Sequence, residues 1–246
     1  ATLHDLDNVL YQVSDEHSAF QLDWKQHMLQ VINASDQQAT VRHLAGAYAA
    51  GADEAKALRS AGAGWLTVAY SDSLPAAVAP IFAVNGDGTN TDRTWAWKSL
   101  MLGYNILAGA DIADPAVNPA PASLLANLGD LNAFAQRIGA GKLAPASGLC
   151  STGYCLANQT PGAAAYAVYA PAGGQVTVDL SAISGTMFYE WFDPATGKSE
   201  PAGMVEAGGA QSFAAPFTGD AVLYLYSAPD MNERLYLPAV TNGALP

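Results

Sequence analysis

The chain has 246 residues, and its 22 acidic and 10 basic side chains give a formal net charge of −12 at pH 7. This balance argues against an undirected electrostatic attraction to nucleic acid or to an anionic membrane, and favours a neutral or cationic partner. Hydrophobic residues make up 50% and charged residues 13%, which indicates a folded chain. No apolar stretch approaches the roughly 20 residues of a membrane span. No charged start with an apolar region marks a signal peptide, so the chain is expected to be cytosolic or already processed.

The first 145 residues alternate strand-like and helix-like segments. The apolar run at 8–13 predicts a buried strand, and the helical spacing of Phe20, Trp24 and Met28 predicts a helix over 20–33. The later predictions are a helix at 53–61, strands at 64–70 and 80–84, a helix at 95–103, a strand at 106–108 and a helix at 123–138. Polar loops follow the strands. This alternation favours a parallel α/β arrangement, a barrel or an open sheet, with its site at the carboxyl ends of the strands.

Downstream of residue 149 the pattern becomes entirely β. Short strands separated by glycine-rich and proline-containing turns are predicted at 166–169, 175–180, 187–192, 211–214 and 221–226. Val176 and Val178 alternate with Gln175 and Thr177, so this strand has one dry face and one wet face. The pattern predicts an antiparallel β-sandwich without a catalytic cluster, and we therefore expect any chemistry to lie upstream.

The two cysteines, Cys150 and Cys155, flank the sequence Ser-Thr-Gly-Tyr. A compact loop of this length can bring the two sulfur atoms together, which predicts a disulfide in an oxidising compartment. The alternative is two inert buried thiols. Two ligands alone would not make a zinc site, and we expect neither a metal nor a cofactor.

The segments from residue 151 onward resemble the module described as a "putative collagen-binding domain of a collagenase". The resemblance rests on Ser151–Asn158, Tyr166–Pro171, Val176–Ser181, Glu190–Gly197 and Ala221–Leu225. In that family the module follows a (β/α)8 barrel similar to glycoside hydrolases of the apiosidase type. Upstream, Asn8–Glu16 resembles the fourth barrel strand, and Trp95–Leu100 with Gly103–Asn105 resembles the helix and turn before the eighth.

The resemblance implies two parts. Residues 1–145 would form a partial (β/α)8 barrel of the TIM type, corresponding to strands four to eight, and residues 146–246 would form the C-terminal β-sandwich. A complete barrel needs about 250 residues. The chain would therefore be a fragment of a longer polypeptide, or it would close its open sheet with a second copy or another chain.

The resemblance also implies a catalytic carboxylate pair, because glycosidases use two such groups on either side of the scissile bond. Glu16 takes the place of the acid/base after strand four, although Asp15 precedes it where the family has Asn. Asp87 is the candidate second carboxylate, although the family's Asp-Thr-Asp-His run is not evident around it. The alternative for both residues is a solvated or helix-capping carboxylate.

Asp15, His17, Asn85 and Trp95 are the predicted substrate-binding residues. His17 lacks a second histidine at ligand spacing, which favours a loop residue beside the carboxylate over a metal ligand. Trp95 and Trp97 diverge by about 200° on a helix, so at most one of them can face a sugar.

The aromatic residues of the sandwich allow two interpretations. Tyr189, Trp191 and Tyr224 could form a platform on which a saccharide stacks, but aromatic residues on sandwich strands usually belong to the core. Ser151 lacks the Gly-x-Ser-x-Gly elbow of a serine hydrolase.

The sequence therefore predicts an exported carbohydrate-active protein, a glycoside hydrolase if it is active, whose partner is a saccharide substrate or ligand. The rival interpretation is a non-catalytic module that binds polysaccharide or another protein through the sandwich, with a truncated barrel that has lost its site. Under either interpretation we expect no membrane span and no nucleic acid partner.

Overall fold

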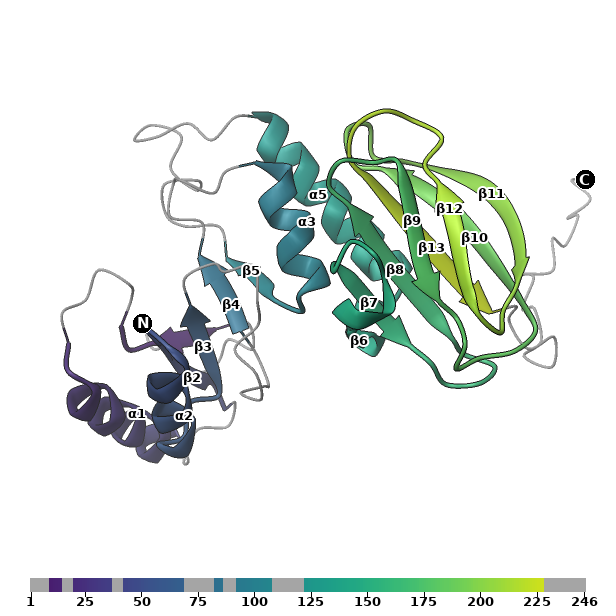
Figure 1. The fold of residues 1–246 in the computed structure, drawn as a ribbon. Coiled ribbons are helices and arrows are strands. Elements are labelled where there is room, and N and C mark those ends of the chain that lie inside the picture. The colour runs from purple at the N-terminus through teal and green to yellow at the C-terminus, as the bar shows by residue number, and fades with distance from the viewer. Residues whose placement is uncertain are drawn as a thin grey trace, which may run out of the picture.

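The computed structural model describes residues 9–14, 20–36, 42–68, 82–85, 92–107 and 122–227. In space, helices α3 (Arg93–Met101) and α5 (Ala122–Arg137) lie between a parallel sheet and a pair of antiparallel sheets (Figure 1). No helix in these described ranges is long and apolar enough to cross a membrane.

The parallel sheet has five strands in sequential order, and each neighbouring pair is parallel. The strands are β1 (Leu10–Gln12), β2 (Leu44–Tyr48), β3 (Trp65–Val68), β4 (Phe82–Asn85) and β5 (Asn105–Leu107). Four of them confirm strands predicted from the sequence, whereas β2 was not predicted. Because the order is sequential and all strands are parallel, their carboxyl ends lie at one edge of the sheet.

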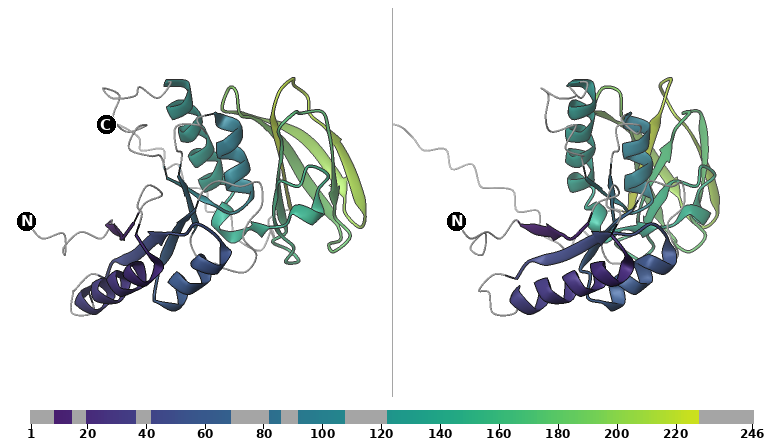
Figure 2. Two further views of the ribbon diagram at one scale, coloured as in Figure 1. Left: turned by 60° about the vertical axis from the view of Figure 1, so that its left-hand side comes forward. Right: turned by 90° about the vertical axis from the view of Figure 1, so that its left-hand side faces the viewer.

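Helices α1 (Leu22–Asp36) and α2 (Ala52–Ser60) cover one face of this sheet (Figure 2). Leu29 of α1 and Leu58 of α2 are fully buried in the same apolar cluster as Leu66 of β3. The predicted helices at 20–33 and 53–61 are confirmed. The helical spacing of their apolar residues directs one stripe toward the sheet, and burying that stripe stabilises the pair.

The opposite face of the sheet carries exposed apolar side chains. Leu10 and Leu44 are paired across β1 and β2, and they remain 54% and 45% exposed. Further along the same face, Trp65 lies over Gly46, where an added Cβ atom would come within 2.4 Å of the indole. Residue 46 must therefore be glycine for the tryptophan to pack there.

Helices α3 (Arg93–Met101) and α5 (Ala122–Arg137) lie beside β5 and against the antiparallel sheets (Figure 1). The Oδ1 atom of Asp92 caps α3 by accepting a hydrogen bond of 2.8 Å from the backbone N–H of Trp95. Trp97 is almost fully buried, and its ring contacts Phe134 of α5. The two helices thus share one core with the sheets on either side.

The antiparallel part consists of a six-stranded sheet in the order β11-β10-β13-β8-β7-β6 and a two-stranded sheet of β12 and β9. Its strands are β6 (Ala144–Pro145), β7 (Cys155–Asn158), β8 (Ala165–Ala170), β9 (Gln175–Asp179), β10 (Thr186–Asp193), β11 (Lys198–Glu206), β12 (Ala210–Ala214) and β13 (Ala221–Ser227). The two sheets enclose a second apolar core, which contains Val176, Trp191 and Leu223. The five predicted strands are confirmed, and β6, β7 and β11 are additional.

A charged contact joins α3 to the six-stranded sheet. The guanidinium of Arg93 donates to both carboxylate oxygens of Asp220, with a shortest distance of 2.7 Å, and the Tyr169 hydroxyl donates to the same carboxylate at 3.0 Å. Asp220 is buried, so this bidentate pair fixes the start of α3 against the sheet. The hydrogen bonds to Asp220 raise the pKa of Arg93.

Candidate functional site

The edge at which the five parallel strands end is the candidate active-site edge, because sites of parallel α/β folds lie there. Among the sequence-predicted residues, Asn85 is the last residue of β4, where it pairs with Leu107 of β5. Asp15, Glu16, His17 and Asp87 lie outside the described residues. The structure describes the strands that precede these residues in the chain, β1 before residues 15–17 and β4 before Asp87.

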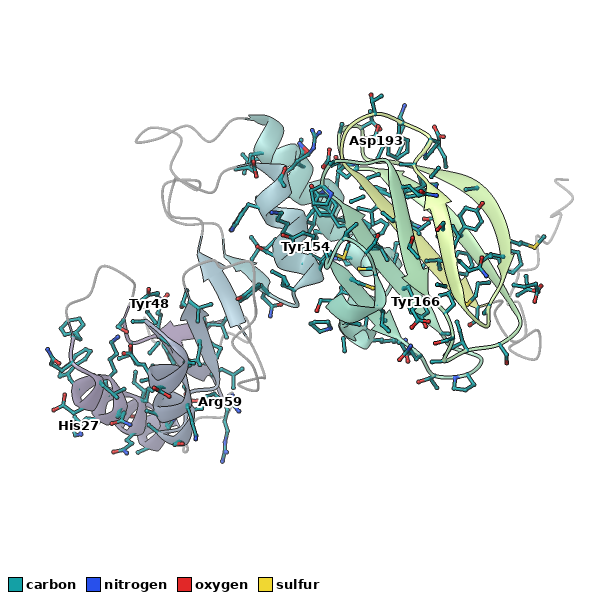
Figure 3. All side chains as sticks on the ribbon, viewed as in Figure 1. His27, Tyr48, Arg59, Tyr154, Tyr166 and Asp193 are labelled. Atoms are coloured by element: carbon teal, nitrogen blue, oxygen red, sulfur yellow. The ribbon has the colours of Figure 1, made fainter. Side chains whose placement is uncertain are left out.

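A hydrogen-bonded network crosses the carboxyl ends of β1, β2 and β3. The Gln12 amide donates to the Ser14 carbonyl at 2.9 Å and to the Thr67 hydroxyl at 3.3 Å. Tyr48, the last residue of β2, is labelled in Figure 3. Its backbone N–H donates to the Ser14 carbonyl at 3.0 Å. These bonds hold the chain just before residues 15–17 against the neighbouring strand.

A partly buried ion pair adjoins this network. Lys25 of α1 donates to Glu54 of α2 at 2.9 Å and to the Tyr48 carbonyl at 3.1 Å, and Glu54 also accepts from the Ala50 N–H at 2.9 Å. Burial acts to raise the pKa of Glu54, but the bonds from Lys25 and Ala50 outweigh it, so the pKa lies below its usual value. Glu54 is therefore anionic at neutral pH and fixes the loop after β2, and it is a poor general acid. The sequence analysis did not identify this pair.

Trp95 lies in the apolar core with only 3% of its surface exposed. Its indole N–H has no hydrogen-bond partner among the described residues. The ring of Trp97 lies between Phe134, Phe192 and Tyr169. Both tryptophans are thus buried in the same apolar core, and Trp95 has little surface available for a sugar.

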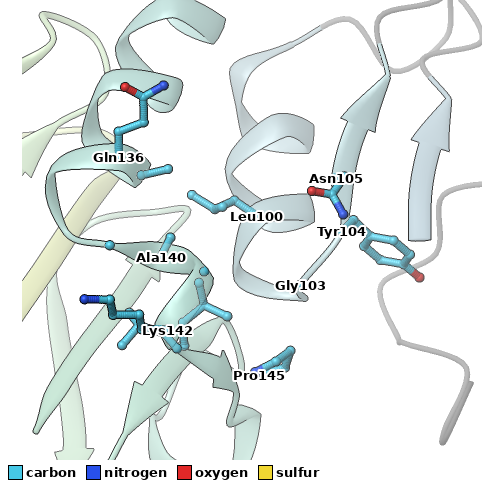
Figure 4. A pocket seen from close by; sticks show the side chains of 13 residues that line it. Leu100, Gly103, Tyr104, Asn105, Gln136, Ala140, Lys142 and Pro145 are labelled. Carbon is cyan, nitrogen blue, oxygen red and sulfur yellow. The ribbon is translucent and has the colours of Figure 1, made fainter. Parts of the chain in front are cut away.

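A pocket of about 650 Å³ lies at the opposite end of the parallel sheet from the candidate edge (Figure 4). Its lining includes Tyr104 and Asn105 at the start of β5, Gln136 of α5 and Lys142 in the turn that follows. The lining combines apolar and polar side chains, and the described residues that form it include no carboxylate. It therefore lacks the acidic pair that the proposed chemistry needs.

The predicted disulfide is wrong for this structure, because Cys150 and Cys155 are both free thiols. The short turn through Gly153 does bring them into contact, and a hydrogen bond between the thiols lowers the pKa of Cys150 to about 6 and raises that of Cys155. Cys150 also lies 3.5 Å from the Thr152 hydroxyl, whereas Cys155 is buried between the sheets. The alternative of two inert buried thiols holds for Cys155, which is buried, but not for Cys150, which is only partly buried and has a lowered pKa.

Of the two interpretations of Tyr189, Trp191 and Tyr224, core packing holds for Tyr189 and Trp191, and the three rings do not form a platform because they do not share a face. Trp191 is buried between the two antiparallel sheets, and Tyr189 packs edge-on against Phe213 in the same core. Tyr224 is paired with Glu190, which stands between Tyr189 and Trp191 on β10, so Tyr224 lies on the other face of the six-stranded sheet. Alternation along a strand separates them.

Comparisons with known proteins find one matching family model and several structures with a similar fold. Residues 151–225 match the family model described as "Putative collagen-binding domain of a collagenase". The fold is similar to that of a glycoside hydrolase structure with a TM-score of 0.51 and 13% identity, over 86% of this chain and 70% of that one. No curated protein matches the chain.

Two further solved structures share the fold. A family 5 glycoside hydrolase from Bacteroides vulgatus ATCC 8482 has a TM-score of 0.52 and 12% identity, over 85% of this chain and 67% of that one. A "putative alpha-galactosidase/melibiase" from Bacteroides fragilis NCTC 9343 has a TM-score of 0.50 and 10% identity, over 89% of this chain and 54% of that one. The chain therefore has a mixed helix and sheet fold similar to that of glycoside hydrolases.

Proposed function

We propose that the chain is a carbohydrate-active protein with the chemistry of a glycoside hydrolase. In this proposal residues 1–145 form part of a (β/α)8 barrel and residues 146–246 form its C-terminal module. The observation that supports it best is the sequential five-stranded parallel sheet, whose strands all end at one edge, within a fold similar to glycoside hydrolase structures. The apiosidase type and the exported location stay predictions from the sequence.

The strand order supports Glu16 and Asp87 as a catalytic pair. Glu16 follows the last described residue of its segment, Ser14, by two positions, and Asp87 follows the end of β4 by two. Strands β1 and β4 are three neighbours apart in the sheet, which is about 14 Å at the usual spacing. Carboxyl side chains that reach inward across a curved sheet would approach the roughly 5 to 10 Å that glycosidases use.

In this mechanism Glu16 protonates the glycosidic oxygen as the bond breaks, and Asp87 attacks or stabilises the anomeric carbon. Asp15, His17 and Asn85 would contact the sugar hydroxyls, because they flank the pair in sequence. Trp95 would contribute only through the edge of its buried ring.

A hydrolysis screen tests this function. The purified chain is incubated with a panel of aryl glycosides and oligosaccharides, beside the Asp87→Asn variant, and the reducing ends released are measured. We expect turnover of at least one substrate by the unmodified chain and its loss, by about 100-fold or more, in the variant. Binding without turnover would instead favour the non-catalytic alternative, and equal turnover in the variant would exclude Asp87.

We also propose that the open sheet binds a second polypeptide. Leu10 and Leu44 are exposed on the face opposite α1 and α2, and β1 and β5 each pair on one side only among the described strands. Pockets of about 200 and 380 Å³ lie beside these two edge strands, next to Tyr11 and Ile106 respectively. Exposed apolar faces and open edges favour association. Light scattering should therefore give a mass above the 25.4 kDa of one chain, and a stable monomer would contradict the proposal.

A further inference from the structure

A row of rings lies on the outer face of the six-stranded sheet. Phe188 of β10 is paired with Tyr226 of β13, and their near-parallel rings have centroids 5.8 Å apart at an interplanar angle of 20°. Tyr224, two residues earlier on β13, continues the row at 5.2 Å and 23°. Met204 of β11 is paired with Phe188 on the other side and is 65% exposed. We name these four residues the aromatic ledge.

The ledge begins where the helices stop covering the sheet. One row further toward the helices, Phe192 and Val222 are buried against α3 and α5. Phe188 and Tyr226 are only half-buried. The near-parallel rings stack beside one another along the row, and because Phe188, Tyr224 and Tyr226 are all only half-buried, part of each side chain is open to solvent. Tyr224 also packs edge-on against Phe134 of α5, whereas Phe188, Tyr226 and Met204 belong to neither apolar core.

Carboxylates border the ledge on both sides. Glu190, paired with Tyr224, is held by Arg137 at 2.6 Å and accepts a hydrogen bond of 3.2 Å from the Ser199 hydroxyl. At the far side Glu206 accepts a hydrogen bond from the Thr186 hydroxyl. Both acids keep free acceptor capacity, because a carboxylate has about four acceptor positions.

We propose that the aromatic ledge binds a neutral polysaccharide, at a site separate from the edge where the parallel strands end. Sugar rings present C–H groups that pack on aromatic faces, and they present hydroxyl donors that the bordering carboxylates accept. The formal charge of −12 opposes an anionic ligand. A neutral, hydroxyl-rich chain satisfies both the apolar row and its acidic border.

Affinity electrophoresis tests the ledge. The chain is run in native gels that contain xyloglucan, galactomannan, mixed-linkage β-glucan, polygalacturonate or gelatin. The ledge variant combines Phe188→Thr and Tyr226→Thr, since threonine favours strands. Met204→Ala is a second variant that leaves the packed rings intact. Leu125→Ala, at a 51% exposed apolar site on α5, is the matched surface control.

We expect at least one neutral polysaccharide to retard the chain, and the dissociation constant to rise about tenfold in the double variant and less in Met204→Ala, with Leu125→Ala unchanged. Retardation by gelatin alone would assign the ledge to a protein ligand and overturn the proposal. The proposal would also be overturned if Met204→Ala and a double variant with unaltered circular dichroism were both retarded as strongly as the unmodified chain. The absence of any retardation of the unmodified chain would overturn it as well. Because the ledge needs neither Glu16 nor Asp87, Asp87→Asn should bind normally even where hydrolysis is lost.

Discussion

Replacing Trp97 with alanine is expected to lower the free energy of unfolding by about 3 to 5 kcal/mol, the usual range for a fully buried tryptophan. The Trp97 ring lies 5.3 Å from the centroids of both Phe134 and Phe192, and 6.0 Å from that of Tyr169. It therefore joins α3, α5 and the six-stranded sheet, and its loss leaves a cavity between all three. Guanidinium unfolding followed by circular dichroism measures the change.

Trp24→Ala is the matched control for this prediction. Trp24 stacks on Phe20 at 4.0 Å near the surface of α1, with 36% of its surface exposed. Its removal should cost less than about 1 kcal/mol, because it leaves no enclosed cavity. Equal losses in the two variants would mean that the contacts of Trp97 do not join the helices to the sandwich.

Glu16→Gln is expected to lower kcat by about 100- to 10,000-fold for substrates with a poor leaving group, such as a second sugar. Glutamine keeps the shape of the side chain but cannot donate the proton that the departing oxygen needs. A dinitrophenolate leaves without protonation, so kcat/KM for a dinitrophenyl glycoside should fall much less than kcat/KM for the sugar substrate. Values of kcat/KM on the two substrate types provide the comparison, because they report the step in which the leaving group departs.

Glu200→Gln is the control for the activity measurement, since Glu200 is exposed on β11 in the antiparallel part of the chain. It should leave both rates unchanged. If Glu16→Gln slowed the dinitrophenyl substrate as strongly as the sugar substrate, Glu16 would not be the general acid.

The strands and helices with clear periodicity could be predicted from the sequence, but β2, β6, β7 and β11 could not, and β2 and β11 show why. Strand β2 reads Leu-Ala-Gly-Ala-Tyr, without the β-branched residues that mark a buried strand, and only the structure shows its place between β1 and β3. Strand β11 contains Pro201 and Gly203, which resemble turn residues in isolation. Both segments form strands because they pair with neighbouring strands in the folded chain.

The candidate site shows the same limit. Acidic and amide residues follow several of the predicted strands. They predicted a site at one edge of the sheet, because the carboxyl ends of parallel strands lie at the same edge. Lys25 and Glu54 are 29 positions apart in the sequence and lie on different helices, and no local spacing signals such a contact. The faces of Trp191 and Tyr224 depend on the register between β10 and β13, which the sequence alone does not fix.

A crystal structure of the Glu16→Gln variant with an oligosaccharide that it binds tests the central claim most directly. The account predicts the sugar at the carboxyl ends of β1 to β5. The substituted side chain at position 16 and the Asp87 carboxylate should lie on either side of one glycosidic bond, with their terminal carbonyl carbons about 5 to 10 Å apart. A sugar bound only elsewhere, or these two side chains on opposite sides of the molecule, would contradict it.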